Sequence, residues 1–434
     1  MKPEKEKKES IFRSRNFSLV FWGAVVSELG SMIYNFTVSF YILQISNNSA
    51  FLQGLYLALC GIAMLAATPV GGVLGDRFNK AKIMYLCDYI RGGTILLGTA
   101  LMLLFQTPGT HLAILFVLGI LGNVVGGIFS PASGALIPHI VPEDRLQQAN
   151  AWFTIKGAVE GILGVVLAGI LYAALPVHLL FFIVGLCFVA SGVSEMLIRY
   201  RHTPSAEQLT LRLAVKDMSD GLRYLKTKKA ILALLGAILF INFFYAPVAS
   251  NFLPYFVRTE LASAPSYLLD HLLTPELWNS VIGVCVGIGS LLGAAIMSGR
   301  KQADKCGYTV AVTLCIEAAA IVSLAFAYWL LVDRGNLLNV FLVLFCCGCF
   351  ASGLLIAFIN IPITTAMMRV VDKDMLSKVN SITNIGSQGM IPIASVLAGA
   401  ILQSWGSSAL LFVCSLGFAV TAVLLLLNKP VREL

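Results

Sequence analysis

The chain has 434 residues, of which 58% are apolar and only 12% are charged, and its formal net charge is +8. Soluble globular proteins carry about 25% charged residues, so this composition excludes a soluble enzyme, a disordered chain and a disulfide scaffold. Because a membrane-spanning helix needs about 20 mostly apolar residues, the chain can supply about twelve of them. An outer-membrane barrel is not favoured, because its strands would alternate polar and apolar residues.

Apolar runs bounded by charges or turn residues predict an all-α membrane protein with twelve transmembrane helices. In chain order the expected spans are 17–45, 51–74, 83–105, 112–137, 151–175, 177–198, 230–257, 278–299, 308–332, 339–362, 381–404 and 407–427. Helices are expected because lipid offers no hydrogen-bond partner to an unpaired backbone group. The first span is far longer than the apolar core of a signal peptide, so we expect it to remain as a helix.

Lysine and arginine residues mark one side of the predicted membrane. Of the 30 such residues, 26 fall in the two ends of the chain and in every second loop, and only Arg258 and Arg334 fall in the other loops. The positive-inside rule therefore places both termini in the cytoplasm. The net charge of +8 is then an orientation signal and a contact with anionic lipid, so no nucleic-acid partner is expected.

Two stretches of the chain repeat one pattern. Matching residues are separated by a constant offset, which equals the separation of Val141 and Val371. The matched positions are Val141, Asp144, Leu146, Asn150 and Leu167-Ala168-Gly169, against Val371, Asp374, Leu376, Asn380 and Leu397-Ala398-Gly399. Six spans separate the copies, so they share one topology, which predicts two parallel six-helix repeats with a site between them near the midplane. We expect an N-terminal half at 1–199, a cytoplasmic linker with an amphipathic helix at 200–229, and a C-terminal half at 230–434.

The loop after the second span carries a further pattern. Gly72, Leu74, Asp76, Arg77 and Lys80 match G-x-L-x-D-R-x-G-R-K, although Asn79 stands where glycine is usual. With the twelve spans and the repeat, this motif resembles the major facilitator superfamily. The Ser-Glu-Leu-Gly run of span 1 and the segment 130–146 resemble its macrolide-efflux and siderophore-exporter branch.

The resemblance implies a monomeric antiporter of a bacterial cell membrane, without a cofactor, that exports small amphiphilic compounds in exchange for protons by alternating access. Such activity would confer multidrug or macrolide resistance. Span 4 lacks the arginine that drug–proton antiporters often carry, and the run Gly164–Gly169 of span 5 lacks the proline of the antiporter signature. These departures leave the transport direction and the coupling ion open.

The signature loop and its second copy predict a cytoplasmic gate. Glycines permit close approach of helices, and Asp76 can accept hydrogen bonds at a helix N-terminus. The resemblance implies that Asp76 meets the start of span 11, near 377–380. The expected gate residues are Gly72, Gly75, Asp76, Arg77, Lys80, Asp304 and Lys305. The alternative is that this loop only anchors the orientation of the chain.

Charged side chains inside spans are costly and are therefore functional candidates. Glu28 and Glu160 both lie near the middle of spans that the resemblance places beside the cavity, and Lys156 lies one helical turn before Glu160. In one interpretation Lys156 and Glu160 form a structural pair, and Glu28 alone is free to carry a proton. In the other, Glu28 and Glu160 exchange a proton for a cationic group of the substrate, because a carboxyl group removed from water holds its proton more tightly.

The remaining charges within spans are expected to pair on their own helices. Asp88 and Arg91 are three residues apart on span 3, and Glu195 and Arg199 are four apart at the end of span 6. Glu317 has no assigned role.

Amide and aromatic side chains supply the candidates for the substrate cavity, namely Asn242, Tyr245, Asn360 and Gln388. Such groups around an apolar cavity suit amphiphilic ligands, and helix packing or lipid contact is the alternative. No metal site is expected, because the cluster of Cys346, Cys347 and Cys349 has no nearby histidine.

Three other functions remain as alternatives to drug export. They are a lysophospholipid flippase or facilitator, a siderophore exporter, and a membrane receptor that transports nothing. An enzyme or ATP-driven pump is not expected, because the chain has no phosphate-binding G-x-x-x-x-G-K-[ST] loop and no histidine cluster.

Overall fold

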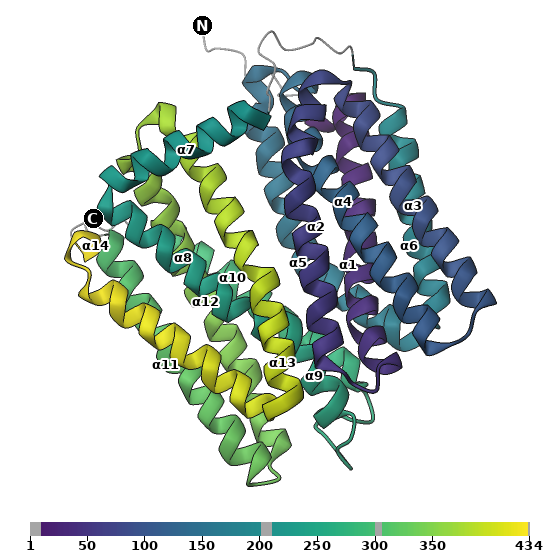
Figure 1. The fold of residues 1–434 in the computed structure, drawn as a ribbon, viewed down its shortest axis with the longest axis vertical. Helices are drawn as coiled ribbons and strands as arrows, with labels where there is room; N and C mark the ends of the chain where they lie inside the picture. Colours follow the sequence, from purple (N-terminus) through teal and green to yellow (C-terminus); the bar gives the residue numbers. More distant parts are fainter. Residues whose placement is uncertain (1–9, 201–210, 300–305, 433–434) are drawn as a thin grey trace, which may run out of the picture.

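The computed structural model describes residues 10–200, 211–299 and 306–432. Within these ranges the chain forms helices joined by short connections, and it forms no strand (Figure 1). Eleven helical segments of the described chain are long and apolar enough to cross a membrane. This result confirms the predicted all-α membrane fold.

The N-terminal half consists of six long helices. They are α1 (Arg15–Ile45), α2 (Ala50–Arg77), α3 (Lys80–Leu104), α4 (Pro108–Ile140), α5 (Leu146–Ala174) and α6 (Val177–Met196), with short 3-10 turns at Ile11–Arg13 and Glu143–Arg145. Side chains of Ser49, Asn79 and Thr107 accept hydrogen bonds from the first turns of α2, α3 and α4. These caps satisfy backbone donors that would otherwise lack partners, and so they fix where the helices begin.

The C-terminal half repeats this plan with more interruptions. Its elements are α8 (Lys229–Pro247), η3 (Val248–Phe252), α9 (Leu253–Phe256), η4 (Val257–Leu261), α10 (Pro275–Gly299), α11 (Cys306–Tyr328), η5 (Trp329–Asp333), α12 (Leu338–Val370), α13 (Lys373–Leu427) and α14 (Lys429–Arg432). The run from α8 to η4 is one span, and its first π-helical turn follows Pro247, which has no backbone N–H to donate.

Helix α13 contains the last two predicted spans. It is 55 residues long, and its regular geometry is broken at Gly406, where φ is 80°. A positive φ of this kind is readily adopted only by glycine. The eleven segments therefore hold the twelve predicted crossings, with the break falling between the expected spans 381–404 and 407–427.

Helix α7 (Leu211–Thr227) lies in the predicted linker and crosses one end of the molecule (Figure 1). It contacts α8, α13 and α2, and the backbone N–H of Asp372 donates to the hydroxyl of Tyr224 at 3.0 Å. We call this end, which also holds the 3-10 turn at Ile11–Arg13 and α14, the terminal face. The opposite end, which holds the loops 46–49, 105–107, 175–176 and 262–274, is the hairpin face.

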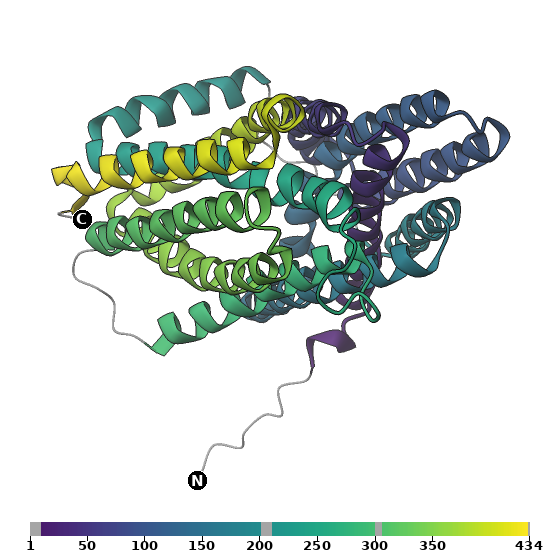
Figure 2. The ribbon, with the colours of Figure 1, turned by 90° about the horizontal axis from the view of Figure 1, so that it is seen from below.

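The two halves meet at the hairpin face and diverge toward the terminal face (Figure 1). One buried apolar core contains side chains of both halves, among them Phe40 and Leu115 of the N-terminal half and Phe252 and Trp278 of the C-terminal half. At the terminal face each half has separate cores of its own. Seen from the hairpin face, the two halves lie side by side (Figure 2).

Candidate functional site

Two pairs of helices form the junction between the halves, α2 against α13 and α5 against α10. The hydroxyl of Ser280 donates to the carbonyl of Val165 across the junction at 2.8 Å, and beside the junction, within the C-terminal half, the amide of Asn251 donates to the carbonyl of Ser395 at 3.2 Å. The amide of Gln53 donates to the carbonyl of Ser250 at 3.3 Å. These hydrogen bonds all lie in the part of the spans near the hairpin face, so that end of the junction is closed.

Glycines allow the helices of this junction to approach closely. A Cβ atom on Gly54 would lie 2.3 Å from the carbonyl oxygen of Ser395, and one on Gly399 would lie 2.5 Å from that of Ala50. A Cβ atom on Gly169 would lie 2.1 Å from the hydroxyl of Ser280. Gly54 and Gly399 therefore bring the backbones of α2 and α13 into contact, and Gly169 leaves room for the side chain of Ser280.

The internal repeat places equivalent positions at the two contacts. Val165 and Ser395 are separated by the offset of the repeat, and the carbonyl oxygens of both lie at the junction. That of Val165 accepts from Ser280 of the opposite half, and that of Ser395 lies 2.3 Å from where a Cβ atom on Gly54 would be. Gly169 and Gly399 are separated by the same offset and are the close-approach glycines of α5 and α13. The repeated Leu-Ala-Gly run therefore contributes to the closed end of the junction in both halves.

Glu28 lies in the middle of α1, and its side chain is exposed. Ser31 and Asn35 follow at three and seven residues, so all three share one face of the helix. Glu28 also lies in electrostatic range of Glu160 on α5 and of Arg91 on α3. The face therefore points into the interior between these helices, where the halves separate toward the terminal face.

Lys156 and Glu160 form an ion pair on α5. The ammonium group of Lys156 lies 2.8 Å from Oε2 of Glu160, and their side chains are only 11% and 5% exposed. The other carboxyl oxygen of Glu160 accepts no hydrogen bond from the described residues. In the structure Glu160 is thus paired and Glu28 is accessible, and which acid carries a proton stays a prediction.

Arg91 does not form the predicted pair with Asp88. Its Nε donates instead to the carbonyl of Gly122 on α4 at 3.3 Å, and its guanidinium lies over the rings of Phe129 and Phe188. No ion pair joins Arg91 to Asp88 within the described residues, because the cation reaches across to α4 rather than along its own helix.

The predicted pair of Glu195 with Arg199 is also absent. Glu195 is fully buried on α6, and its carboxyl oxygens accept no hydrogen bond in the described part of the chain. The backbone N–H of Arg199 donates to Asn16, just beyond the end of α6. In both cases helical spacing alone predicted an ion pair that the structure does not form.

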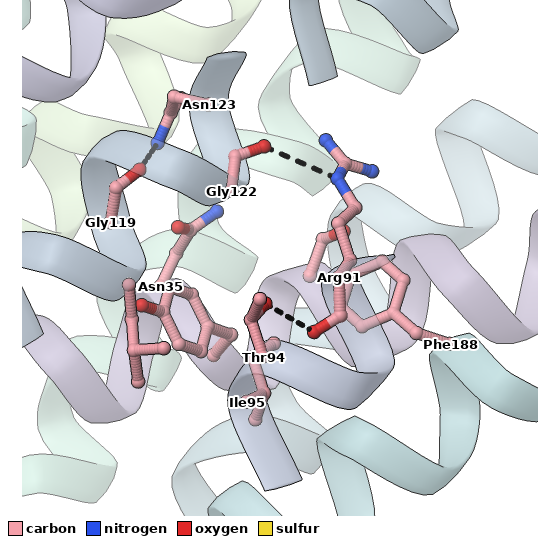
Figure 3. A pocket seen from close by; sticks show the side chains of 11 residues that line it. Asn35, Arg91, Thr94, Ile95, Gly119, Gly122, Asn123 and Phe188 are labelled. Carbon is pink, nitrogen blue, oxygen red and sulfur yellow. Dashed lines mark hydrogen bonds between the residues drawn. The ribbon is translucent and has the colours of Figure 1, made fainter. Parts of the chain in front are cut away.

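A cavity of about 90 Å³ with a mixed polar and apolar lining lies beside Arg91, inside the N-terminal half (Figure 3). Residues of α1, α3, α4 and α6 line it: Ser31, Tyr34, Asn35, Arg91, Thr94, Ile95, Leu118, Gly119, Gly122, Asn123 and Phe188. The side-chain amide of Asn123 donates to the carbonyl of Gly119 on the same helix at 2.8 Å. The sequence prediction missed this cavity, although the glycines at 122 and 126 form one face of α4 and could have indicated space for a large neighbour.

The predicted substrate residues are distributed over the C-terminal half. Asn360 on α12 and Gln388 on α13 are exposed, whereas the amide of Asn242 donates to the carbonyl of Ile238 on its own helix. Tyr245 packs against Phe418 in the core of the C-terminal half. Their contact with a substrate stays a prediction.

The predicted gate is described only in part. Gly72 and Arg77 lie at the end of α2, Gly75 faces the backbone of Ala132 on α4, and Lys80 is buried at the start of α3. Asp304 and Lys305 lie outside the described residues, and so do the side chains of Asp76 and of positions 377, 378 and 380. The gate therefore stays a prediction.

No group of three or more histidine, cysteine or acidic side chains could hold a metal ion in the described residues. The carboxyl group of Glu317 is buried on α11 next to Ser352, and it accepts no hydrogen bond there.

Comparison with known families and proteins matches residues 20–395 to the model of the Major Facilitator Superfamily. An uncharacterised MFS-type transporter of Bacillus subtilis, YkuC, is 22% identical over 383 residues, which cover 85% of this chain and 81% of that protein. The putative bacilysin exporter BacE of the same species is 26% identical over 58% of this chain and 59% of its own. Macrolide efflux protein A of Streptococcus pyogenes is 21% identical over 65% of each chain.

Solved structures with the same fold are more distant in sequence. A bacterial homologue of the iron transporter ferroportin, in an inward-facing state, superposes with a TM-score of 0.67 at 15% identity, covering 95% of this chain and 100% of that one. The peptide transporter POT superposes with a TM-score of 0.71 at 13% identity, covering 96% and 95%. At such low identities these structures show the fold alone.

Proposed function

Because the chain belongs to the major facilitator superfamily, we propose that this transporter exports small amphiphilic compounds from a bacterial cytoplasm in exchange for protons. Two of the relatives are named as exporters, one of bacilysin and one of macrolides. The family and fold are those of transporters and not of enzymes. We further propose that it works as a monomer in the cell membrane, with the terminal face in the cytoplasm, as the distribution of basic residues indicates.

The observation that carries this proposal is the asymmetry of the junction between the halves. They share one core at the hairpin face and have separate cores at the terminal face. A substrate would enter between the halves from the cytoplasm, and a rocking motion about the midplane would then release it outside. Closing the terminal face would bring the signature loop of α2 to the start of α13, where Asp76 would act as the gate.

Glu28 is the carboxyl group best placed to couple protons to this cycle. It is exposed, it lies in the middle of its span, and no ion pair of the described residues includes it. A proton on Glu28 and a cationic group of the substrate would compete for the same carboxylate. Glu160 is held by Lys156 in this state, so it would take part only if that ion pair opened.

The experiment is a transport assay in proteoliposomes with an imposed pH gradient and radiolabelled erythromycin, a lysophospholipid and a siderophore as separate probes. Wild-type vesicles that are acidic inside should accumulate the macrolide, because protons that leave drive the compound inward. Glu28→Gln should allow only equilibration. Asp270→Asn, which changes an exposed acid in a loop of the hairpin face, is the matched control and should transport like the wild type.

Two results would overturn parts of this proposal. Uphill accumulation by Glu28→Gln at the wild-type rate would show that Glu28 does not carry the coupled proton. Transport of every probe without any response to the pH gradient would show that proton coupling is wrong, and movement of the lysophospholipid alone would favour a flippase.

A further inference from the structure

Three ionisable side chains meet inside the N-terminal half, where α3 packs against α6. Asp88 on α3 and Glu195 on α6 are both 0% exposed, and they lie in electrostatic range of one another and of Arg91. None of their four carboxyl oxygens accepts a hydrogen bond from a described residue. The nearby hydroxyl of Ser191 faces Asp88 but does not reach hydrogen-bonding geometry.

Within the described residues this group contains one cation, and that cation forms its hydrogen bond with another helix instead of with either acid. Arg91 donates from Nε to the carbonyl of Gly122 on α4. A Cβ atom on Gly126 would lie 2.2 Å from one of the terminal nitrogens of Arg91, so the guanidinium rests directly on the backbone of α4. The rings of Phe129 and Phe188 cover it, at 5.7 Å and 5.3 Å from the guanidinium carbon.

This arrangement has a consequence for the charge of the cluster. A carboxylate buried without a partner is strongly destabilised, and two neighbouring carboxylates cannot both remain ionised. If one of these acids lost its proton, it would offer Arg91 a hydrogen bond between opposite charges, with a Coulomb attraction that a neutral carbonyl does not supply. Arg91 therefore has two competing partners, a carboxylate on one side and the Gly122 carbonyl on the other.

We propose that Asp88, Glu195 and Arg91 form a proton-operated latch, in which Arg91 holds α4 while both acids are protonated and releases it when one of them is ionised. The latch deepens the proposed proton coupling and rests on it. The proton is exchanged with the aqueous interior, and the guanidinium moves from the Gly122 carbonyl to the ionised acid. No bond other than O–H is made or broken.

The surroundings of Arg91 show why the effect would pass to α4. The titratable groups in electrostatic range of Arg91 are Cys87 and Asp88 on α3, Glu28 on α1 and Glu195 on α6. From α4 it meets Gly122, Gly126 and Phe129, none of which titrates. Arg91 therefore connects this cluster directly to α4.

Helix α4 is also connected to the accessible interior. Its residues Gly122 and Asn123 line the cavity beside Arg91, and Asn35 of α1 lines the same cavity from the face that carries Glu28 (Figure 3). Release of α4 would thus alter the wall of the interior next to Glu28. Glu28 would bind the proton that competes with the substrate, and Asp88 and Glu195 would control the position of α4.

Infrared spectroscopy of the protein in lipid nanodiscs tests the protonated acids directly and needs no substrate. Raising the pH should remove a carboxylic-acid carbonyl band from the wild-type spectrum, and the double variant Asp88→Asn/Glu195→Gln should lack that band. Glu317→Gln changes the buried acid of the other half and should leave the band in place. An unchanged band in the double variant would overturn the proposal.

The movement is tested by single-molecule fluorescence transfer between dyes on non-canonical residues at Glu143 and Arg369, both exposed near the terminal face. The distribution of distances should shift with pH in the wild type and not in the double variant. Arg91→Gln keeps an amide donor for Gly122 but has no charge, so it should remain folded and should also lose the pH response. A response to pH in both variants that equals the wild type would overturn the latch.

The proteoliposome assay separates failure of the latch from failure of the proposed function. If the wild type accumulates a probe in response to the pH gradient and the double variant accumulates it equally well, the latch is wrong and proton-coupled export stands. If the wild type ignores the gradient, the proposed coupling is wrong, and the latch as a coupling device falls with it even where the infrared band is present.

Discussion

The partner of a buried charged side chain in this protein depends on the groups that neighbouring helices place beside it, and not on spacing along its own helix alone. Lys156 and Glu160 are four residues apart and do form an ion pair. Asp88 and Arg91 are three apart and do not, because Arg91 reaches the backbone of α4. Spacing predicted the first pair because both side chains project from one face of α5, but it could not reveal a competing carbonyl on another helix.

The ion pair of α5 gives a stability prediction. Lys156→Met removes the cation and leaves Glu160 buried without a partner, which should lower the stability of the folded protein by about 3 kcal/mol. Lys156→Met/Glu160→Met removes both charges and should recover most of that loss. Thermal unfolding in nanodiscs measures the difference. Equal losses for the single and double variants would show that the pair does not behave as a buried ion pair.

At the scale of helices, the sequence located the spans well because a membrane crossing has a fixed length and composition. It could not show that α13 runs through two of them with a single break, nor that the span after the linker contains π-helical turns. Those details depend on one glycine conformation and on the geometry beside Pro247. Of the predicted gate, the side chain of Asp76 and the residues Asp304 and Lys305 lie outside the described part of the chain.

The break in α13 depends on Gly406. Its φ of 80° and ψ of −178° define a region that is almost confined to glycine. Although a Cβ atom would meet nothing within 4 Å there, Gly406→Ala should destabilise the protein by about 1–3 kcal/mol through backbone strain alone. Gly236→Ala, in the regular helix α8 and equally open, should be neutral or slightly stabilising. Thermal unfolding of both variants would show no difference if strain at Gly406 were unimportant.

The contact between α2 and α13 gives a conformational prediction. Gly54→Ala would place a methyl group 2.3 Å from a backbone carbonyl of α13, and overpacking of this kind costs about 1–3 kcal/mol. If this cost arises only in the state in which the hairpin face is closed, the equilibrium would shift about 5–150-fold toward the state in which that face is open. Hydrogen–deuterium exchange of residues 50–61 and 392–402 should become faster, whereas Gly161→Ala, at an open position of α5, should leave it unchanged.

At the scale of the whole molecule, the internal repeat explains how one chain builds a symmetric junction. Its constant offset brings Val165 and Ser395, and likewise Gly169 and Gly399, to the junction between the halves. The sequence revealed this repeat because loop and helix residues agree at one offset. It could not reveal which end of the junction is closed. The same chain can adopt a state closed at either end, and only the relative free energies of the two states decide which one is populated.

The most direct test of this account follows the two faces of one molecule in lipid nanodiscs. One pair of spin labels at Glu143 and Arg369 reports on the terminal face, and another at Gln106 and Leu272 reports on the hairpin face; all four residues are exposed. Alternating access predicts that, as pH or an added macrolide changes the populations, one distance lengthens while the other shortens. If either distance stays fixed while the other changes, or if both faces open together, the account of a transporter that rocks between two halves is contradicted.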